Sequence, residues 1–396
     1  MGRFFREALA ACKEFGNCSA FSKLDRKYRR VVFYSENRDS YAYFEGLVNH
    51  LINEFDIPIC YITSQSTDPL LERHHPNFRA FYIKYTLVNF IASLDADILV
   101  MTMPDLNLFH IKRSRNDTNH VYLFHNIGSA FSTLRFGALF HYDTIFCVGP
   151  HHREEIQRQE EKYGLGESCL VNSGYYKLEK VYQDYQRHRS TVNLNRVDTK
   201  RKGRVLLAPT WGENSILNLC GSQLIHILIK ANYEVTVRPH VMTRDREQGL
   251  IKSLNREFAG FDNYTYEDDT ASTESFYESD VLISDWSGVS YEYAFGTERP
   301  VLFIDVPQKV VNPRYKEIGI EPMDIGVRTL VGEVLGLSDL NRADDAIAML
   351  MANRDTYVQE IRKAREKYIF NFGESSRAGA EYIRDFLMSR DKSGQQ

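Results

Sequence analysis

The sequence has no uninterrupted hydrophobic run of the kind that crosses a bilayer. Arg, Lys and Glu break every apolar stretch before the roughly 18 residues that a membrane-spanning helix needs, and the first residues do not have the pattern of a secretory signal peptide. A surplus of charge of one sign is also absent, since 49 Lys and Arg face 53 Asp and Glu, a formal net charge of −4. Nucleic acid is therefore not expected as the main partner.

Cysteine is scarce, and neither cysteine nor histidine occurs at metal-ligand spacing. The six cysteines include no CxxC pair and lie mostly in apolar runs, so we expect buried thiols in a reducing compartment. The histidine pairs at 74–75 and 151–152 have no Cys or carboxylate at such spacing. The Asp-Ala-Asp triplet at 95–97 resembles a metal-binding D-x-D motif, but it opens a strand instead of ending one. No metal is expected, and because no GxGxxG follows the first expected strand, no dinucleotide cofactor is expected either.

The chain has ample apolar material for more than one core. Its 396 residues are more than a single hydrophobic core usually supports, so two domains are expected. The composition, with 43% hydrophobic and 26% charged residues, is typical of a globular protein. Residues 1–30 differ from the rest, with eight Lys or Arg against three acids. One helical face there collects the apolar residues Phe4, Phe5, Ala8, Leu9 and Cys12. The segment is either a basic amphipathic helix at a membrane surface or a helix packed on the body of the protein.

Short apolar runs alternate with amphipathic segments, which is typical of βαβ units and parallel sheets. A first domain is expected over residues 31–175, with such runs at 31–35, 58–63, 79–83, 97–102, 121–125 and 144–149. After a polar linker region at 176–203, a second domain is expected over 204–340, with runs at 204–209, 233–239, 264–266, 280–284 and 300–305. Residues 341–396 have a helical pattern and are expected to pack back over the first domain. The predicted fold is α/β, with two doubly wound, Rossmann-like domains facing a central cleft.

Polar clusters follow the apolar runs, and a histidine ends one run in each half. Ligands of open α/β sheets bind at the carboxyl ends of the strands, so the expected site is a cleft built by both domains. The clusters are Ser35-Glu36-Asn37-Arg38, Pro104-Asp105, His125-Asn126-Ile127-Gly128-Ser129, Thr210-Trp211-Gly212-Glu213, Arg238-Pro239-His240 and Ser284-Asp285-Trp286-Ser287-Gly288.

The segment 280–305, DVLISDWSGVSYEYAFGTERPVLFID, has the order strand, polar turn, helix, strand. Ser287 and Gly288 open the helix, whose free backbone N–H groups and positive dipole end suit a phosphate. The hydroxyls of Ser287 and Ser290 can add donors. Equally, Ser287 can be a plain N-cap of that helix, and the pattern alone does not decide between the two.

This segment resembles the T/S-D-Y-S-S-x-x-x-D-Y block of the bacterial CDP-glycerol glycerophosphotransferases, the family of teichoic-acid polymerases and primases. Three more blocks agree in order and spacing: APTWGENS (208–215) is similar to A-P-T-W-R-[DE]-N, VRPH (237–240) to K/R-x-H-P, and NSGYYKLEK (172–180) to T-G-x-P-R-x-D. YLFHNIGS (122–129) takes the place of a W-H-G-T block. The chain departs from the family pattern at Asn126 (Gly in the family), Gly288 (Ser), Val241 (Pro) and 175–177 (a Pro-Arg pair).

The resemblance covers residues 95–310 and implies the two-domain GT-B fold. It implies attack by an acceptor hydroxyl on the β-phosphorus of a CDP-activated polyol, with release of CMP, and it assigns the chemistry to His125 and His240. An imidazole with a pKa of about 6.5 suits a general base, which we expect of His125, while His240 and Arg238 suit the donor diphosphate. The other donor-binding residues expected are Thr210, Trp211, Asp285, Ser287, Gly288 and Ser290. Those expected on the acceptor side are Asn126, Gly128 and Ser129.

The expected partners are a CDP-activated donor and a glycan or lipid-linked acceptor, met in the cytoplasm or on the inner face of the membrane. Three alternatives stay open. A glycosyltransferase of the same fold would use a nucleotide sugar, a 2-epimerase would need an acid-base set that we cannot place, and a degenerate binding protein would account for the motif departures. The released nucleotide separates the expected function from the first alternative, since CMP selects polyol-phosphate transfer and UDP or GDP selects glycosyl transfer.

Overall fold

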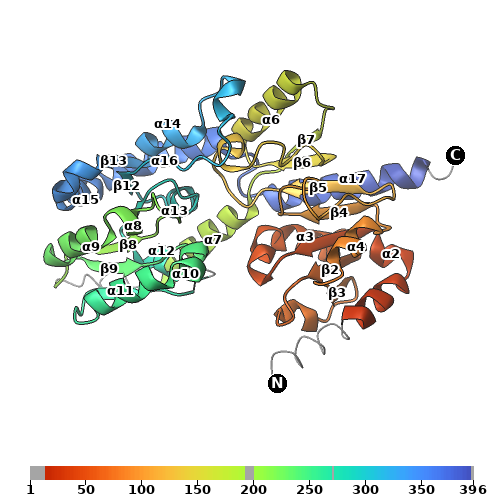
Figure 1. Cartoon of the computed structure of the whole chain (residues 1–396), viewed down its shortest axis with the longest axis horizontal. Helices are drawn as coiled ribbons and strands as arrows, with labels where there is room; N and C mark the ends of the chain where they lie inside the picture. Colours follow the sequence, from red (N-terminus) through yellow and green to blue (C-terminus); the bar gives the residue numbers. More distant parts are fainter. Residues whose placement is uncertain (1–13, 192–199, 270–271, 394–396) are drawn as a thin grey trace.

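The computed structural model describes residues 14–191, 200–269 and 272–393, and this part of the chain contains two parallel sheets (Figure 1). The first sheet has the order β3-β2-β1-β4-β5-β6-β7. Its strands are β1 (Val31–Ser35), β2 (Ile59–Thr63), β3 (Phe78–Tyr82), β4 (Ile98–Met101), β5 (Asn119–Leu123), β6 (Thr144–Cys147) and β7 (Cys169–Asn172). The strand order reverses between β1 and β4, which is where open α/β sheets bind their ligands.

The second sheet repeats this pattern in the order β10-β9-β8-β11-β12-β13. Its strands are β8 (Arg204–Leu207), β9 (Glu234–Val237), β10 (Tyr264–Tyr266), β11 (Val281–Ser284), β12 (Val301–Asp305) and β13 (Gly332–Gly336). Every pairing between these named strands is parallel. The predicted fold class, two doubly wound domains, is confirmed.

Helices separate the strands and cover the sheets. In the first half they are α2 (Arg26–Arg29), η1 (Arg38–Tyr43), α3 (Glu45–Asn53), η2 (Pro69–Glu72), α4 (Leu87–Ala92), α5 (Ala130–Thr133), α6 (Pro150–Tyr163) and α7 (Tyr176–Thr191). In the second half they are α8 (Ile216–Leu219), α9 (Gly221–Lys230), α10 (Val241–Arg246), α11 (Gln248–Phe258), α12 (Glu274–Glu278), α13 (Val289–Thr297), η3 (Tyr315–Ile318) and α14 (Met323–Val331). The chain ends with η4 (Leu337–Arg342), α15 (Ala343–Ala352), α16 (Arg354–Tyr368) and α17 (Ser375–Ser393).

The strands at the centre of each sheet are buried on both faces. Every residue of β1, β2, β4, β5 and β11 is buried, which explains why the apolar residues of these strands are consecutive instead of alternating with polar ones. The covering helices are amphipathic, and α9 buries Leu224, Ile225, Leu228 and Ile229 on one face. The strands and the helices therefore have different hydrophobic patterns, and this difference made the fold predictable from the sequence.

Two helices tie the halves together. The helix α7, within the stretch interpreted as a linker region, packs against α13 of the second half. The last helix, α17, returns to the first half and packs against α3, as predicted (Figure 1). There Gly379 lets the helix approach Phe146 closely, and the Tyr382 hydroxyl lies 2.8 Å from Oγ1 of Thr144 on β6.

The strands β7 and β13 were not predicted from the sequence. Both lie at the ends of their sheets, and β7 has no buried residue while β13 begins and ends with glycine. Neither segment therefore has the continuous apolar run that marked the central strands.

The described part of the basic N-terminal segment packs on the first half. Residues 14–22 are helical, Phe21 is buried against the rings of Phe81 and Phe90, and the Glu14 carboxylate accepts hydrogen bonds from the amides of Tyr85 and Thr86. The apolar face predicted from Phe4 to Cys12 lies outside the described residues. Among the helices that are described, none is both long enough and apolar enough to span a membrane.

Candidate active site

His125 lies in the loop that follows β5, and its position fixes which ring nitrogen carries a proton. Nδ1 lies 3.1 Å from the carbonyl oxygen of Thr102, after β4. A carbonyl can only accept, so Nδ1 donates and Nε2 of the neutral ring keeps a free lone pair. Burial lowers the pKa of His125 below 6.5, and the Lys177 ammonium lowers it further against the Thr102 hydrogen bond. His125 is therefore a neutral imidazole at pH 7 with Nε2 available as a base.

An ion pair connects the surroundings of His125 to the second half. Lys177 Nζ at the start of α7 lies 2.8 Å from the carboxylate of Glu292 on α13, and the Tyr175 hydroxyl donates to the same carboxylate at 2.8 Å. Lys177 also lies 5.1 Å from the ring centroid of Tyr43, whose ring is 6.1 Å from that of His125. Burial alone would lower the pKa of Lys177, but the adjacent Glu292 carboxylate raises it above its ordinary value. Lys177 is therefore a fixed cation where the halves meet.

His240 follows β9 in the second half and has the opposite proton arrangement. It is the N-cap of α10, where Nδ1 accepts the amide N–H of Met242 at 3.1 Å, so the ring proton lies on Nε2. Burial, with the nearby Lys309 and Lys177 ammonium groups, lowers the pKa of His240 to about 4. His240 is thus a neutral N–H donor at pH 7, and its binding of the donor diphosphate stays a prediction.

Asp285 holds the loop that contains Thr210 and Trp211. Its buried carboxylate accepts the amide N–H of Thr210 at 2.7 Å and that of Ile216 at 3.1 Å. Burial raises the pKa of Asp285 to about 6 in spite of these hydrogen bonds. The loop brings the Trp211 ring to 6.3 Å from that of His240. Asp285 and the Thr210 amide therefore position Trp211, and donor binding by these residues stays a prediction.

The start of α13 has the form of an anion site. Gly288 precedes α13 and has no side chain with which to cap it, and whether Ser287 is a cap or a phosphate ligand stays a prediction. The Ser290 hydroxyl is buried and donates its proton to the carbonyl of Ser287 at 2.7 Å, so this proton is not available to a phosphate. Backbone N–H groups at such a helix start, together with the Ser287 hydroxyl, suit a phosphate.

Asn126 of the first half lies directly over this helix start. A Cβ atom at Gly288 would collide with the Asn126 carboxamide oxygen, which accepts the amide N–H of Gly128 at 3.1 Å. The two departures from the family pattern noted above, Asn126 and Gly288, are thus in contact. The space beside Gly288, where the family has a serine side chain from the second half, is filled here by the Asn126 side chain from the first half.

We expect the substitutions Gly288→Ser and Asn126→Gly to be energetically coupled. Gly288→Ser displaces the Asn126 carboxamide from the Gly128 N–H and should destabilise the protein by about 1 kcal/mol, the worth of one hydrogen bond. Asn126→Gly removes the same bond, so the double variant should be about 1 kcal/mol more stable than the sum of the single changes. Urea unfolding of all four proteins measures this coupling, and strict additivity would contradict the contact.

The remaining acceptor-side residues are also held between the halves. The Ser129 amide donates to Oδ2 of Asp324 on α14 at 2.8 Å, and a Cβ atom at Gly128 would collide with the same carboxylate. The histidines 151 and 152, at the start of α6, each donate from Nε2 at 2.8 Å to a carbonyl of the His125 loop, those of Ile127 and Gly128. This pair therefore supports the His125 loop.

Arg238, two residues before His240, is buried against an aromatic ring. Its side chain is 7% exposed, its guanidinium carbon lies 4.9 Å from the ring centroid of Phe276, and burial lowers its pKa although Glu267 and Glu292 oppose the change.

Taken together, these contacts bring His125, Asn126, Gly288 and the start of α13 together at the junction of the halves, with His240 and Trp211 beside them.

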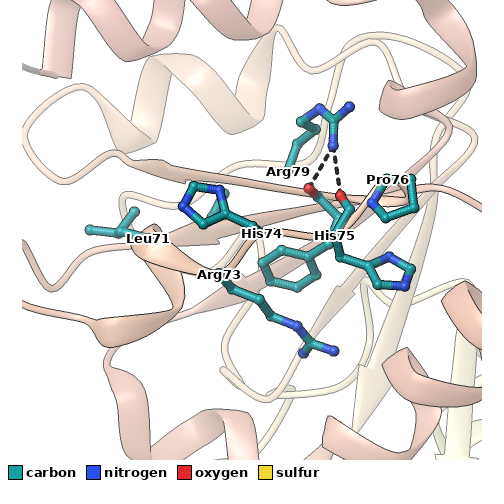
Figure 2. A pocket seen from close by; sticks show the side chains of 8 residues that line it. Leu71, Arg73, His74, His75, Pro76 and Arg79 are labelled. Carbon is teal, nitrogen blue, oxygen red and sulfur yellow. Dashed lines mark hydrogen bonds between the residues drawn. The ribbon is translucent and has the colours of Figure 1, made fainter.

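A separate groove lies at the edge strand β3, away from these residues. Figure 2 shows Arg73, His74, His75, Pro76 and Arg79 around it, with the Arg79 guanidinium bound to two backbone carbonyls. Nδ1 of His75 accepts the amide N–H of Asn77 at 3.1 Å, which is a structural role. This groove lies at the amino-terminal end of β3, whereas the candidate site lies at the carboxyl ends of the strands.

The charged residues at the junction that were absent from the sequence-based site include Lys177, Glu292 and Lys309. Lys177 and Glu292 lie inside the blocks NSGYYKLEK and SDWSGVSYEY, but they are 115 positions apart and no pattern pairs them. Lys309 follows β12 in a loop that matches no motif. Only the tertiary arrangement reveals these three.

Comparison with known proteins gives one family match and many similar folds. The model of the family described as CDP-Glycerol:Poly(glycerophosphate) glycerophosphotransferase matches residues 19–309. No curated protein matches the sequence. The solved structure of the wall teichoic acid polymerase TagF is similar with 14% identity and a TM-score of 0.61 over 97% of this chain and 96% of that one.

Two epimerase structures share the fold as well. The UDP-GlcNAc 2-epimerase of Methanocaldococcus jannaschii has 10% identity and a TM-score of 0.57, over 90% of this chain and 99% of that one. A putative UDP-N-acetylglucosamine 2-epimerase from Listeria monocytogenes has 12% identity and a TM-score of 0.55, over 88% and 94%. At these identities the similarity establishes the fold, the GT-B arrangement of two doubly wound domains, and nothing finer.

Proposed function

The chain belongs to the CDP-glycerol:poly(glycerophosphate) glycerophosphotransferase family and is a transferase, and we propose that it moves glycerol phosphate from CDP-glycerol to a hydroxyl of a surface-polymer acceptor. The observation that carries this proposal is the pair of histidines with opposite tautomers, a base in one half and an N–H donor in the other. Transfer of a phosphoryl group needs positioning and charge stabilisation more than covalent help, and this pair supplies both.

In the proposed reaction the acceptor hydroxyl lies against Nε2 of His125, which takes its proton as the oxygen attacks the β-phosphorus. A new P–O bond forms to the acceptor, and the bond from the β-phosphorus to the oxygen bridging it to the α-phosphorus breaks, so that CMP leaves. Nε2–H of His240 donates to an oxygen of the diphosphate, and the start of α13 with the Ser287 hydroxyl binds another. Asn126, Gly128 and Ser129 hold the His125 loop against the second half during the transfer.

The experiment that tests this function identifies the nucleotide released. Purified protein is incubated with poly(glycerophosphate) and, in separate reactions, CDP-glycerol, CDP-ribitol, and UDP- or GDP-sugars. We expect CMP from CDP-glycerol, with one glycerol phosphate gained by the acceptor for each CMP. Release of UDP or GDP with sugar transfer would instead establish a glycosyltransferase, the second candidate, which the GT-B fold favours. CMP formed without acceptor elongation would contradict transfer.

We also propose that residues 1–30 bring the protein to an anionic membrane surface, where a lipid-linked acceptor lies. This segment carries eight Lys or Arg against three acids, and each basic residue near such a surface contributes about 1 kcal/mol. Because residues 14–22 already pack on the first half, the test deletes residues 1–13 only. Equal sedimentation of the full and shortened proteins with phosphatidylserine-containing vesicles would refute the idea.

A further inference from the structure

Lys309 is a cation at the junction that no motif marks. It follows β12, at the carboxyl end of the second sheet. Its Nζ lies 3.5 Å from the ring centroid of Trp211 and donates to the Trp211 carbonyl at 3.1 Å. The side chain is only partly exposed, so the ammonium is held on the face of the indole beside His240.

Lys309 differs from Lys177 in having no carboxylate partner among the described residues. The two nearest acids are occupied: Asp285 accepts the amides of Thr210 and Ile216, and Glu247 accepts the Gly212 amide at 3.3 Å and the Asn218 carboxamide at 2.6 Å. An ammonium has three N–H donors, and the Trp211 carbonyl uses one of them. A partly buried cation with unused donors lies here beside the N–H donor of His240.

We propose that Lys309 binds the diphosphate of the nucleotide donor, as a further binding residue of the transfer reaction. This rests on the function proposed above and gives the donor diphosphate a cation beside His240, which is itself neutral. An ammonium is a common phosphate ligand, and a diphosphate placed against Lys309 and Nε2–H of His240 receives one charged and one neutral donor from the same half.

Lys309 also gives donor binding a pH signature. Burial lowers the pKa of Lys309 to about 8, although the Asp285 and Glu247 carboxylates oppose the change. The charged form that binds phosphate is present below this pKa, so affinity should fall as the pH rises through 8. The other titrating neighbours act at lower pH, His240 at about 4 and Asp285 at about 6. The Arg246 guanidinium also lies here, 5.5 Å from the Trp211 centroid. The diphosphate diester of CDP-glycerol does not titrate in this range.

The test is calorimetric titration with CDP-glycerol at pH 7 and pH 9. Lys309→Met should weaken binding at pH 7 by about 10- to 100-fold, the range of a charge-assisted hydrogen bond. The wild type should lose about tenfold between pH 7 and pH 9, and Lys309→Arg, charged at both pH values, should not. Lys316→Met, a change at an exposed lysine of η3, is the matched control and should behave as wild type.

The outcomes separate this proposal from the function on which it rests. A wild type that does not bind CDP-glycerol at all would remove the proposed function and this inference with it. A wild type that binds, with Lys309→Met showing the same affinity or the same loss between pH 7 and pH 9, would overturn the role of Lys309 and leave the function standing. A lower Tm of Lys309→Met with unchanged donor affinity would make Lys309 a support of the Trp211 loop and would equally overturn the proposal.

Discussion

Replacing His125 with glutamine should lower turnover by about 10²- to 10⁴-fold, the usual worth of a general base, while CDP-glycerol still binds. The reason is the geometry of the ring: Nδ1–H donates a hydrogen bond to the Thr102 carbonyl at 3.1 Å, so the lone pair of Nε2 is the one that the reaction uses. Glutamine is close in size and keeps a donor for Thr102, but it has no basic nitrogen. Steady-state CMP release, with the donor Kd from calorimetry, measures both quantities.

The control for this variant is His110→Gln, because His110 is exposed in the loop after β4. It should keep wild-type turnover. The pH dependence gives a second readout. The pKa of His125 is lowered below 6.5, so the base is mostly neutral at pH 7 and the acid limb of the rate profile should be centred below pH 6.5. Near wild-type turnover in His125→Gln, or an acid limb centred above pH 6.5, would contradict a base at this position.

Replacing Glu292 with glutamine should destabilise the protein by about 2–3 kcal/mol, since it leaves the Lys177 ammonium without its counter-charge. The Glu292 side chain is 8% exposed and that of Lys177 is 25% exposed, so water compensates only in part. The Tyr175 hydroxyl loses its carboxylate acceptor as well. Lys177 lies over the ring of Tyr43, and that ring contacts the ring of His125. Turnover should therefore fall as well as the free energy of unfolding, which is measured in urea.

The matched control is Glu161→Gln on α6. Glu161 also pairs with a cation, Arg158, at 3.1 Å, but both side chains are more than half exposed, and such pairs are worth at most about 1 kcal/mol. Adding Lys177→Met to Glu292→Gln should recover much of the lost stability, since the uncompensated charge is gone. If the two changes simply added, the ion pair would not be the link between the halves that we describe.

The fold was largely predictable because its central strands and covering helices have different periodicities. Continuous apolar runs at β1, β2 and β11 stood out since helices cover both faces of each sheet. The edge strand β7, with no buried residue, lacks that signal. Local sequence therefore gives the middle of each sheet more reliably than its margins.

The site was predictable only as a set of strand ends. The positions of His125, Asn126 and Gly288 follow from the rule that parallel strands end together. Their roles did not follow, because they depend on contacts across the fold. The sequence could not indicate that His240 would use Nδ1 as an N-cap, nor that the Lys177 ammonium would face the Glu292 carboxylate.

The measurement that tests the central claim most directly is the Kd of CDP-glycerol for the two histidine variants side by side. His125→Gln should bind within about twofold of wild type, because the base contacts the acceptor. His240→Asn, which keeps an N-cap oxygen for the Met242 amide but loses Nε2–H, should bind the donor about tenfold more weakly, the worth of one hydrogen bond to a charged group. Equal losses in both variants, or undiminished affinity in His240→Asn, would contradict a site with one histidine for the acceptor and the other for the donor.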